Sequence, residues 1–150
     1  MPGKYEDLGI SFQYPDNWTL DEEDIAEGRQ SVTVYSPDGA FWSVAVHPVA
    51  ADPGQLIEAA VNAMKEEYEG IEVEDSREVL EGHELTGCKL NFFFLDLTST
   101  AKIRCLKTPL AVYSIFCQGE DREFERIGRV FQAMTRSLLG GLRQAEPGDA

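Results

Sequence analysis

The amino-acid sequence predicts an α+β protein in which a central antiparallel β-sheet of about six to seven strands is flanked by two main α-helices. Apolar and polar residues alternate in seven segments, which is the pattern of half-buried strands. Short turn signals separate most of these segments, and strands joined by short turns pair antiparallel. Only two segments have the 3.6-residue periodicity of amphipathic helices. Strand–helix–strand units do not repeat along the chain, so the sequence disfavours a parallel nucleotide-binding sheet.

The first three predicted strands lie in the N-terminal third of the chain. Residues 9–14 form the first strand, and Trp18, which follows a proline turn, is expected to anchor the core. Residues 31–49 form a hairpin, because Ser36-Pro37-Asp38-Gly39 places proline and glycine where a β-turn favours them. The run Asp21-Glu22-Glu23-Asp24 is expected to be a solvated loop, since like charges this dense repel one another.

Two segments have helical signals. The first helix covers residues 53–69, with Asp52 as its N-cap and Gly70 at its end. Its buried side is expected to consist of Leu56, Ile57, Ala60, Val61, Met64 and Tyr68. The second helix runs from about Asp121 to Leu139 and is expected to end at Gly140-Gly141. Its buried stripe is expected to consist of Phe124, Ile127, Val130, Phe131, Met134 and Leu138.

The remaining strands lie between the two helices. They are predicted at residues 71–80, 83–97, 101–107 and 110–118. Their turns are predicted at Glu81-Gly82, Thr98-Ser99-Thr100 and Thr108-Pro109. A single domain is therefore expected over residues 5–139, followed by a flexible C-terminal tail over residues 140–150.

The charge is strongly acidic and unevenly distributed. The chain has 27 acidic and 13 basic residues, for a net charge of −14. Residues 1–75 contain 17 acidic and three basic residues, whereas residues 76–150 contain ten of each. An acidic excess repels phosphate backbones and anionic lipid surfaces, so we expect neither a nucleic acid nor a membrane as partner.

The cysteines and the chain start indicate a cytoplasmic protein. Cys88, Cys105 and Cys117 form no C-x-x-C pair, so we expect three reduced, buried side chains. No apolar run reaches the roughly 18 residues of a membrane span. Residues 1–7 lack the apolar stretch of a signal peptide, which also favours the cytoplasm.

The sequence offers no set of residues that indicates catalysis, and we expect no enzyme, cofactor or metal. His47 and His83 lie at predicted strand ends, and nothing in the sequence places a cysteine beside either of them. The chain has no nucleophile elbow, zinc-protease motif, P-loop or dinucleotide fingerprint. The run at residues 21–24 has four consecutive carboxylates, whereas a calcium loop staggers its ligands around a glycine.

Two sets of residues are candidates for binding a partner. Arg122, Arg126, Arg129 and Arg136 share one direction on the second helix, opposite its apolar stripe. They form either an exposed face with internal pairing or a site for an acidic partner or an anionic ligand. Phe93, Leu95 and Leu97 lie on the strand face opposite Leu90, Phe92 and Phe94. They are core residues if helices cover both sheet faces and an exposed apolar patch if only one face is covered.

The segment Gly9-Ile10-Ser11-Phe12-Gln13-Tyr14-Pro15-Asp16-Asn17-Trp18 resembles the opening motif of PsbP-like proteins. Their superfamily also contains Mog-type Ran-binding proteins and bacterial DcrB-like proteins, and the resemblance covers about residues 5–139. It implies a central antiparallel sheet flanked by helices, and a binding protein rather than an enzyme. Family roles include extrinsic photosystem subunits, binding of a small GTPase and chaperoning of apolar segments of secreted effectors. A photosystem role would need a targeting segment, which we do not find.

The function expected from the sequence is therefore a non-enzymatic cytoplasmic binding or adaptor protein that recognises another protein. One alternative is a carrier or chaperone that holds a small molecule or an apolar segment in a pocket between sheet and helix. Another is an enzyme whose site the sequence does not reveal. A flat apolar patch, a deep cavity, or a histidine beside a cysteine or carboxylate would distinguish the three.

Overall fold

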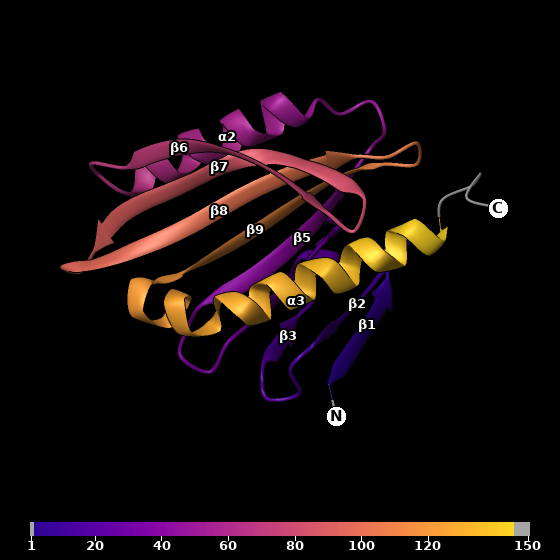
Figure 1. Cartoon of the computed structure of the whole chain (residues 1–150), viewed down its shortest axis with the longest axis horizontal. Coiled ribbons are helices and arrows are strands. Elements are labelled where there is room, and N and C mark those ends of the chain that lie inside the picture. Colours follow the sequence, from indigo (N-terminus) through magenta and orange to yellow (C-terminus); the bar gives the residue numbers. More distant parts are fainter. Residues whose placement is uncertain (1, 146–150) are drawn as a thin grey trace.

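The computed structural model describes the backbone of residues 2–145 and the side chains of residues 2–142. Its main feature is a seven-stranded antiparallel sheet of order β3-β4-β5-β9-β8-β7-β6, accompanied by a two-stranded sheet, β1-β2 (Figure 1). The elements are β1 (Gly3–Asp7), β2 (Ile10–Tyr14), β3 (Thr19–Asp21), α1 (Glu23–Ala26), β4 (Ser31–Tyr35), β5 (Phe41–His47), α2 (Pro53–Glu67), β6 (Glu72–Leu80), β7 (His83–Phe94), β8 (Leu97–Lys107), β9 (Val112–Glu120) and α3 (Asp121–Ala145). The predicted α+β class is confirmed.

The two long helices pack on opposite faces of the main sheet. Asp52 caps α2 as predicted, its Oδ1 accepting a hydrogen bond of 2.9 Å from the Gly54 N–H. Val61 and Met64 of α2 pack against the face of β7 and β8 that carries Leu90, Phe92 and Ile103. Helix α3 packs on the other face, together with the β1-β2 sheet (Figure 1).

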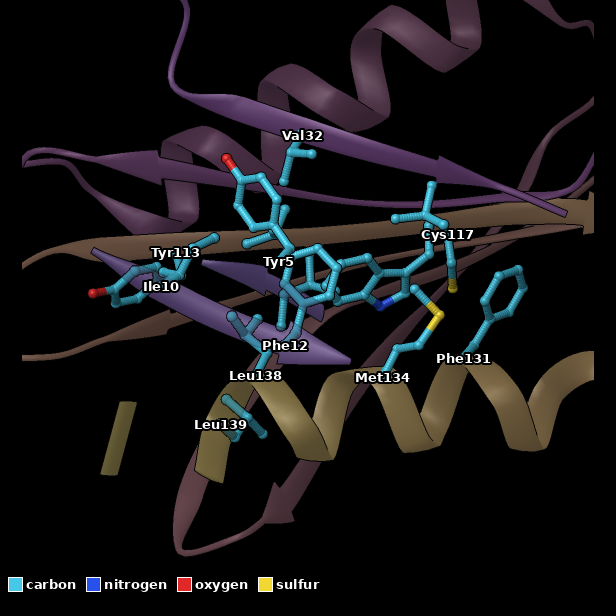
Figure 2. Close-up of a cluster of buried hydrophobic side chains, with 14 of the residues drawn as sticks. Tyr5, Ile10, Phe12, Val32, Tyr113, Cys117, Phe131, Met134, Leu138 and Leu139 are labelled. Atoms are coloured by element: carbon cyan, nitrogen blue, oxygen red, sulfur yellow. The ribbon is translucent and has the colours of Figure 1, made fainter. Parts of the chain in front are cut away.

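The larger core lies between α3, the β1-β2 sheet and the β4-β5-β9 part of the main sheet. Figure 2 shows Phe12 of β2 beside Met134 and Leu138 of α3. The ring of Phe12 lies 4.8 Å from that of Trp42, which is fully buried on β5. Trp18 is also buried, with its ring edge-to-face against Phe131 at 5.7 Å, so the prediction that it anchors the core is confirmed.

The acidic run was wrongly predicted to be a loop. The chain forms β3 up to Asp21, and after Glu22 the short helix α1 begins at Glu23. Arg29 compensates the repulsion, since its guanidinium forms salt bridges with Asp24, at 2.7 Å, and with Glu27. Ser31 also donates a 2.5 Å hydrogen bond to Asp24. The prediction considered only the like charges and left out this arginine, which follows the run in the sequence.

One turn was predicted in the wrong place. The turn at Glu81-Gly82 is confirmed, with φ of 50° and 79°. The next turn is Leu95-Asp96, with φ of 52° and 64°, rather than residues 98–100, which belong to β8. Phe94 pairs with Leu97 across this two-residue turn. The left-handed turn was not recognised because neither residue is the glycine or asparagine that such turns usually require.

The second helix extends beyond its predicted end. It continues through Gly140-Gly141 to Ala145, and Leu142 is buried. The prediction that the helix ends at Gly140-Gly141 is therefore wrong. Residues 140–145, which were assigned to the tail, continue the helix, and residues 146–150 lie outside the described part. A Cβ on Gly141 would lie 2.7 Å from Ser11 Oγ. This glycine therefore allows close packing of α3 on β2 instead of ending the helix.

Candidate partner-binding site

Four exposed apolar side chains surround the turn between β7 and β8. Phe93, Phe94, Leu95 and Leu97 are 65%, 52%, 79% and 43% exposed, and we call them the tip surface. Figure 1 shows this hairpin turning at the left of the view, past the ends of α2 and α3. Phe93 and Leu95 are therefore surface residues rather than core residues. They are exposed because the hairpin projects beyond both helices, although helices lie on both faces of the sheet.

The turn in this surface is itself unfavourable. Leu95 has φ of 52° and Asp96 has φ of 64°. The left-handed region costs an ordinary L-residue roughly 1–2 kcal/mol, and aspartate tolerates it better than leucine. Strained backbone and exposed large apolar side chains therefore coincide at one place. Both features are disfavoured by folding alone and are enriched at functional sites.

A hollow of about 210 Å³ adjoins the tip surface. Phe94 and Leu97 of the tip form part of its wall, together with Tyr68, whose ring lies 5.7 Å from that of Phe94. Three carboxyl side chains line the same hollow, and we call it the acidic hollow: Asp38, Glu120 and Glu123. Glu123 is buried and accepts hydrogen bonds from Ser36 Oγ and from the Ala40 N–H, at 3.1 Å for the latter. The hollow thus joins an apolar wall to three carboxyl groups, of which Asp38 and Glu120 form salt bridges with Arg126 and Arg122.

All four arginines predicted to be exposed on the second helix are exposed. Two of them are partly neutralised. Arg126 forms a 2.7 Å salt bridge with Asp38, and Arg122 forms one of 3.3 Å with Glu120. Within the described side chains, no carboxylate lies within salt-bridge distance of Arg129 or Arg136. The acidic half of the chain and the arginine stripe therefore meet at Asp38, so they do not form two fully separate surfaces.

A second hollow, of about 360 Å³, lies between β2 and α3, and we call it the β2–α3 hollow. Its wall is mostly apolar, formed by side chains such as Tyr14, Pro15, Val130 and Met134. Arg129 contributes its only charged side chain among those described. This hollow corresponds to the pocket between sheet and helix that the carrier or chaperone alternative requires.

Among the described residues, no histidine forms a hydrogen bond with a thiol. His47 Nε2 lies 2.9 Å from Ser114 Oγ, and burial lowers the pKa of this histidine. The described residues place no carboxylate against His47 that could orient its ring, so the pair lacks the third member of a catalytic triad.

The cysteines are buried and free. Burial raises the pKa of Cys105 to about 11 and raises those of Cys88 and Cys117 as well. A high pKa keeps the thiols protonated near neutral pH, and the thiolate is the reactive form. Over residues 2–142, no three His, Cys, Asp or Glu side chains are grouped to hold a metal ion. None of the helices described is both long and apolar enough to cross a membrane.

Comparison with solved structures shows the same fold in several proteins. The chain is similar to PsbP (CyanoP) of Synechocystis, with a TM-score of 0.60 and 12% identity over 91% of this chain and 90% of that one. It is also similar to PA94 of Pseudomonas aeruginosa, a protein of unknown function, with a TM-score of 0.55 and 10% identity over 91% and 95% of the two chains.

A third similar structure is LpqN of Mycobacterium tuberculosis, which is involved in cell envelope biogenesis. Its TM-score is 0.50 at 16% identity, over 89% of this chain and 86% of that one. No family model matches the sequence, and no curated protein matches it. At these identities the likeness concerns the fold, and it agrees with the resemblance carried by the opening motif. The chain has the PsbP-like fold.

Proposed function

We propose that this protein is a non-enzymatic binding protein that recognises another protein through the tip surface. The observation that carries the proposal is the exposure of Phe93, Phe94, Leu95 and Leu97 around a strained turn. A stable hairpin needs none of these side chains at its end, and exposed apolar patches of this kind mark partner sites. At 10–16% identity, the similar structures reported above carry no activity over to this chain.

The partner segment we propose has apolar side chains flanked by lysine or arginine. The acidic hollow supports this choice, because Asp38, Glu120 and Glu123 lie beside the apolar wall of Phe94 and Leu97. Asp96 adds a carboxylate at the turn itself, and the chain as a whole carries a net charge of −14. Complementary charge increases the association rate and selects between partners more than it increases affinity. The three buried free thiols support a reducing compartment for this function.

Two synthetic peptides test the proposal. They share an apolar core and differ only in their flanks, which are lysine in one and glutamate in the other. We expect the lysine-flanked peptide to bind and the Phe93→Asp, Leu95→Asp double variant to bind it at least tenfold more weakly. Val79→Asp is the matched control, because Val79 is an equally exposed apolar side chain, at 68%, on β6 and outside the tip surface. Equal loss in the control, or binding of neither peptide, would refute the proposal.

A second copy of the chain is an alternative occupant of the tip surface, and the same variants distinguish it from a separate partner. Light scattering measures the molar mass of the wild-type protein and of the Phe93→Asp, Leu95→Asp variant in solution. We expect a monomer in both cases. A wild-type dimer that the double variant converts to a monomer would show that the tip surface covers itself, and would overturn the proposal of a separate partner.

The β2–α3 hollow favours a second candidate, a carrier of a small apolar carboxylate. Its apolar wall would hold the hydrocarbon part, and Arg129, which has no salt bridge within the described side chains, would bind the carboxylate. Displacement of a fluorescent fatty acid tests this function. If Arg129→Gln weakens fatty-acid binding and Phe93→Asp leaves it unchanged, the result supports the carrier function over the protein-binding function.

A further inference from the structure

A group of basic side chains lies on the face of the main sheet that α3 covers only in part. Antiparallel pairing places Lys89 of β7 directly opposite Lys102 of β8. Arg104 lies two residues further along β8, on the same face as Lys102. Both β8 side chains face α3, because Lys102 lies 5.7 Å from the Phe124 ring and Arg104 Nη2 donates a hydrogen bond to Thr135 Oγ1.

These three side chains line one hollow of about 240 Å³, which we call the basic pocket. Its wall toward the sheet edge is formed by residues 74–78 of β6. Helix α3 packs on β8, β9 and β2 but makes no comparable contact with β6 or β7, so it leaves this part of the face open (Figure 1).

Arg104 is only partly satisfied by the fold. The residue is 4% exposed, and its Nη1 donates a 2.6 Å hydrogen bond to Glu78 Oε1. Its Nη2 bonds to Thr135 at 3.3 Å, whereas its Nε is buried with no hydrogen-bond partner among the described residues. A buried donor without a partner costs free energy, and in native proteins such donors are few. This N–H is therefore one sign that a further acceptor belongs in the pocket.

The two lysines supply a second, independent sign. Like charges directly opposite each other on neighbouring strands destabilise a sheet. In the described part of the chain no carboxylate lies within 4 Å of the ammonium group of Lys89 or Lys102, although the protein has twice as many acidic as basic residues. Glu74 pairs with Lys89 in the sheet register without forming a salt bridge, and Glu78 is held by Arg104. The Phe124 ring lies against Lys102 and Glu74 lies opposite Lys89, but neither lysine forms a salt bridge among the described residues, and an anion would neutralise both.

We propose that the basic pocket binds a small molecule through an anionic oxygen group, either a carboxylate or a phosphoryl group. The ammonium groups of Lys89 and Lys102 and the guanidinium of Arg104 supply the charge-assisted donors that recognise such groups. A small ligand fits a hollow of about 240 Å³. A polyanion such as a nucleic acid is disfavoured, because Glu74 and Asp75 border the pocket and the rest of the protein is strongly acidic.

This site is separate from the tip surface. Lys89 and Lys102 lie several residues back from the turn along β7 and β8, whereas the tip surface begins at Phe93. The proposal therefore does not depend on the proposed function, and substitutions at one site leave the other intact. The lysines are chosen for the test rather than Arg104, because Arg104 also connects β6 to α3.

Titration with inorganic phosphate and with succinate, at constant ionic strength and neutral pH, tests the proposal. Amide chemical shifts follow binding, and we expect saturable shifts in residues 74–78, 87–89 and 102–104 with one anion per chain. Stronger binding of phosphate identifies a phosphoryl ligand, and stronger binding of succinate identifies a carboxylate. Lys89→Met and Lys102→Met should each weaken the preferred anion at least tenfold. These variants keep an unbranched apolar side chain of similar length, so the fold is retained.

Lys107→Met is the matched control, because Lys107 is an exposed lysine on the same strand and does not line the pocket. Its affinity for both anions should stay within twofold of the wild type. Absence of saturable shifts with both anions would overturn the proposal. An equal loss in Lys107→Met would do the same, since it would show that the anions respond to overall charge rather than to the pocket.

Discussion

Replacing the turn Leu95-Asp96 by Asn-Gly should stabilise the protein and weaken its binding to a partner. Both residues have positive φ, at 52° and 64°. A left-handed conformation costs roughly 1–2 kcal/mol for an ordinary L-residue, and Asn-Gly is the sequence that two-residue hairpin turns prefer. Relief of this strain at Leu95, with a smaller gain at Asp96, sets the upper limit of the effect at about 2–3 kcal/mol.

Two losses reduce that gain. Leu95 is 79% exposed, so removing its side chain sacrifices little buried apolar surface, worth about 0.5 kcal/mol at 25 cal/mol per Å². The new glycine adds conformational entropy to the unfolded chain and costs about 0.5–1 kcal/mol. The expected net gain in unfolding free energy is about 1 kcal/mol, which corresponds to a rise of about 2–4 °C in the melting temperature for a chain of this length.

Urea denaturation followed by circular dichroism measures this gain, and peptide binding is measured on the same samples. We predict that stability increases while affinity for the lysine-flanked peptide decreases, because the variant removes an apolar side chain from the tip surface. Opposite changes in stability and binding are the expected sign of a site kept for function. A variant less stable than the wild type would refute the claim that the turn is strained.

Three further predictions concern the core, the thiols and the arginines. Trp18→Ala should lower the unfolding free energy by about 3–5 kcal/mol, because the indole is buried against Phe131; a loss below about 1 kcal/mol in urea denaturation would contradict its anchoring role. Burial raises the pKa of Cys105 to about 11 from 9.0. The stability that this protonated thiol contributes is therefore complete below pH 9 and is lost as the pH rises through 11. Thermal melts between these two pH values should show a decline in melting temperature that Cys105→Ala reduces. Replacing Arg129 and Arg136 together by Gln should change stability by less than about 1 kcal/mol, since both are exposed and neither forms a salt bridge within the described side chains; a larger loss in urea denaturation would show that they support the fold.

The sequence predicted most of the architecture because local signals and tertiary packing agree. The alternation in β5 and the cap at Asp52 each have one dominant physical cause, and the structure confirms both. Strand β1 was missed, since Gly3–Asp7 contains only one buried side chain, Tyr5, and its pairing with β2 supplies the rest of its stability. The apparent helix stop at Gly140-Gly141 is a packing feature, which only the proximity of Ser11 reveals.

The candidate sites were harder to predict because they depend on distant contacts. The exposure of Phe93 and Leu95 follows from where the hairpin turns, and a leucine in the left-handed region gives no sequence signal. Local reasoning did not pair Arg126 with Asp38, which is 88 residues away. The basic pocket was not recognised at all. The sequence feature that indicates this pocket is the pairing of Lys89 with Lys102 on neighbouring strands. That pairing follows only when the turn between the two strands is placed correctly.

Hydrogen exchange tests the central claim, that the tip surface is where this protein recognises its partner, most directly. Amide exchange is measured with and without the lysine-flanked peptide at saturating concentration. We predict protection of residues 93–98 at the tip and of residues 38–41 in the acidic hollow, with exchange in the β2–α3 hollow unchanged. Protection confined to residues 13–15 and 129–137, which border the β2–α3 hollow, would contradict the account and favour the carrier function.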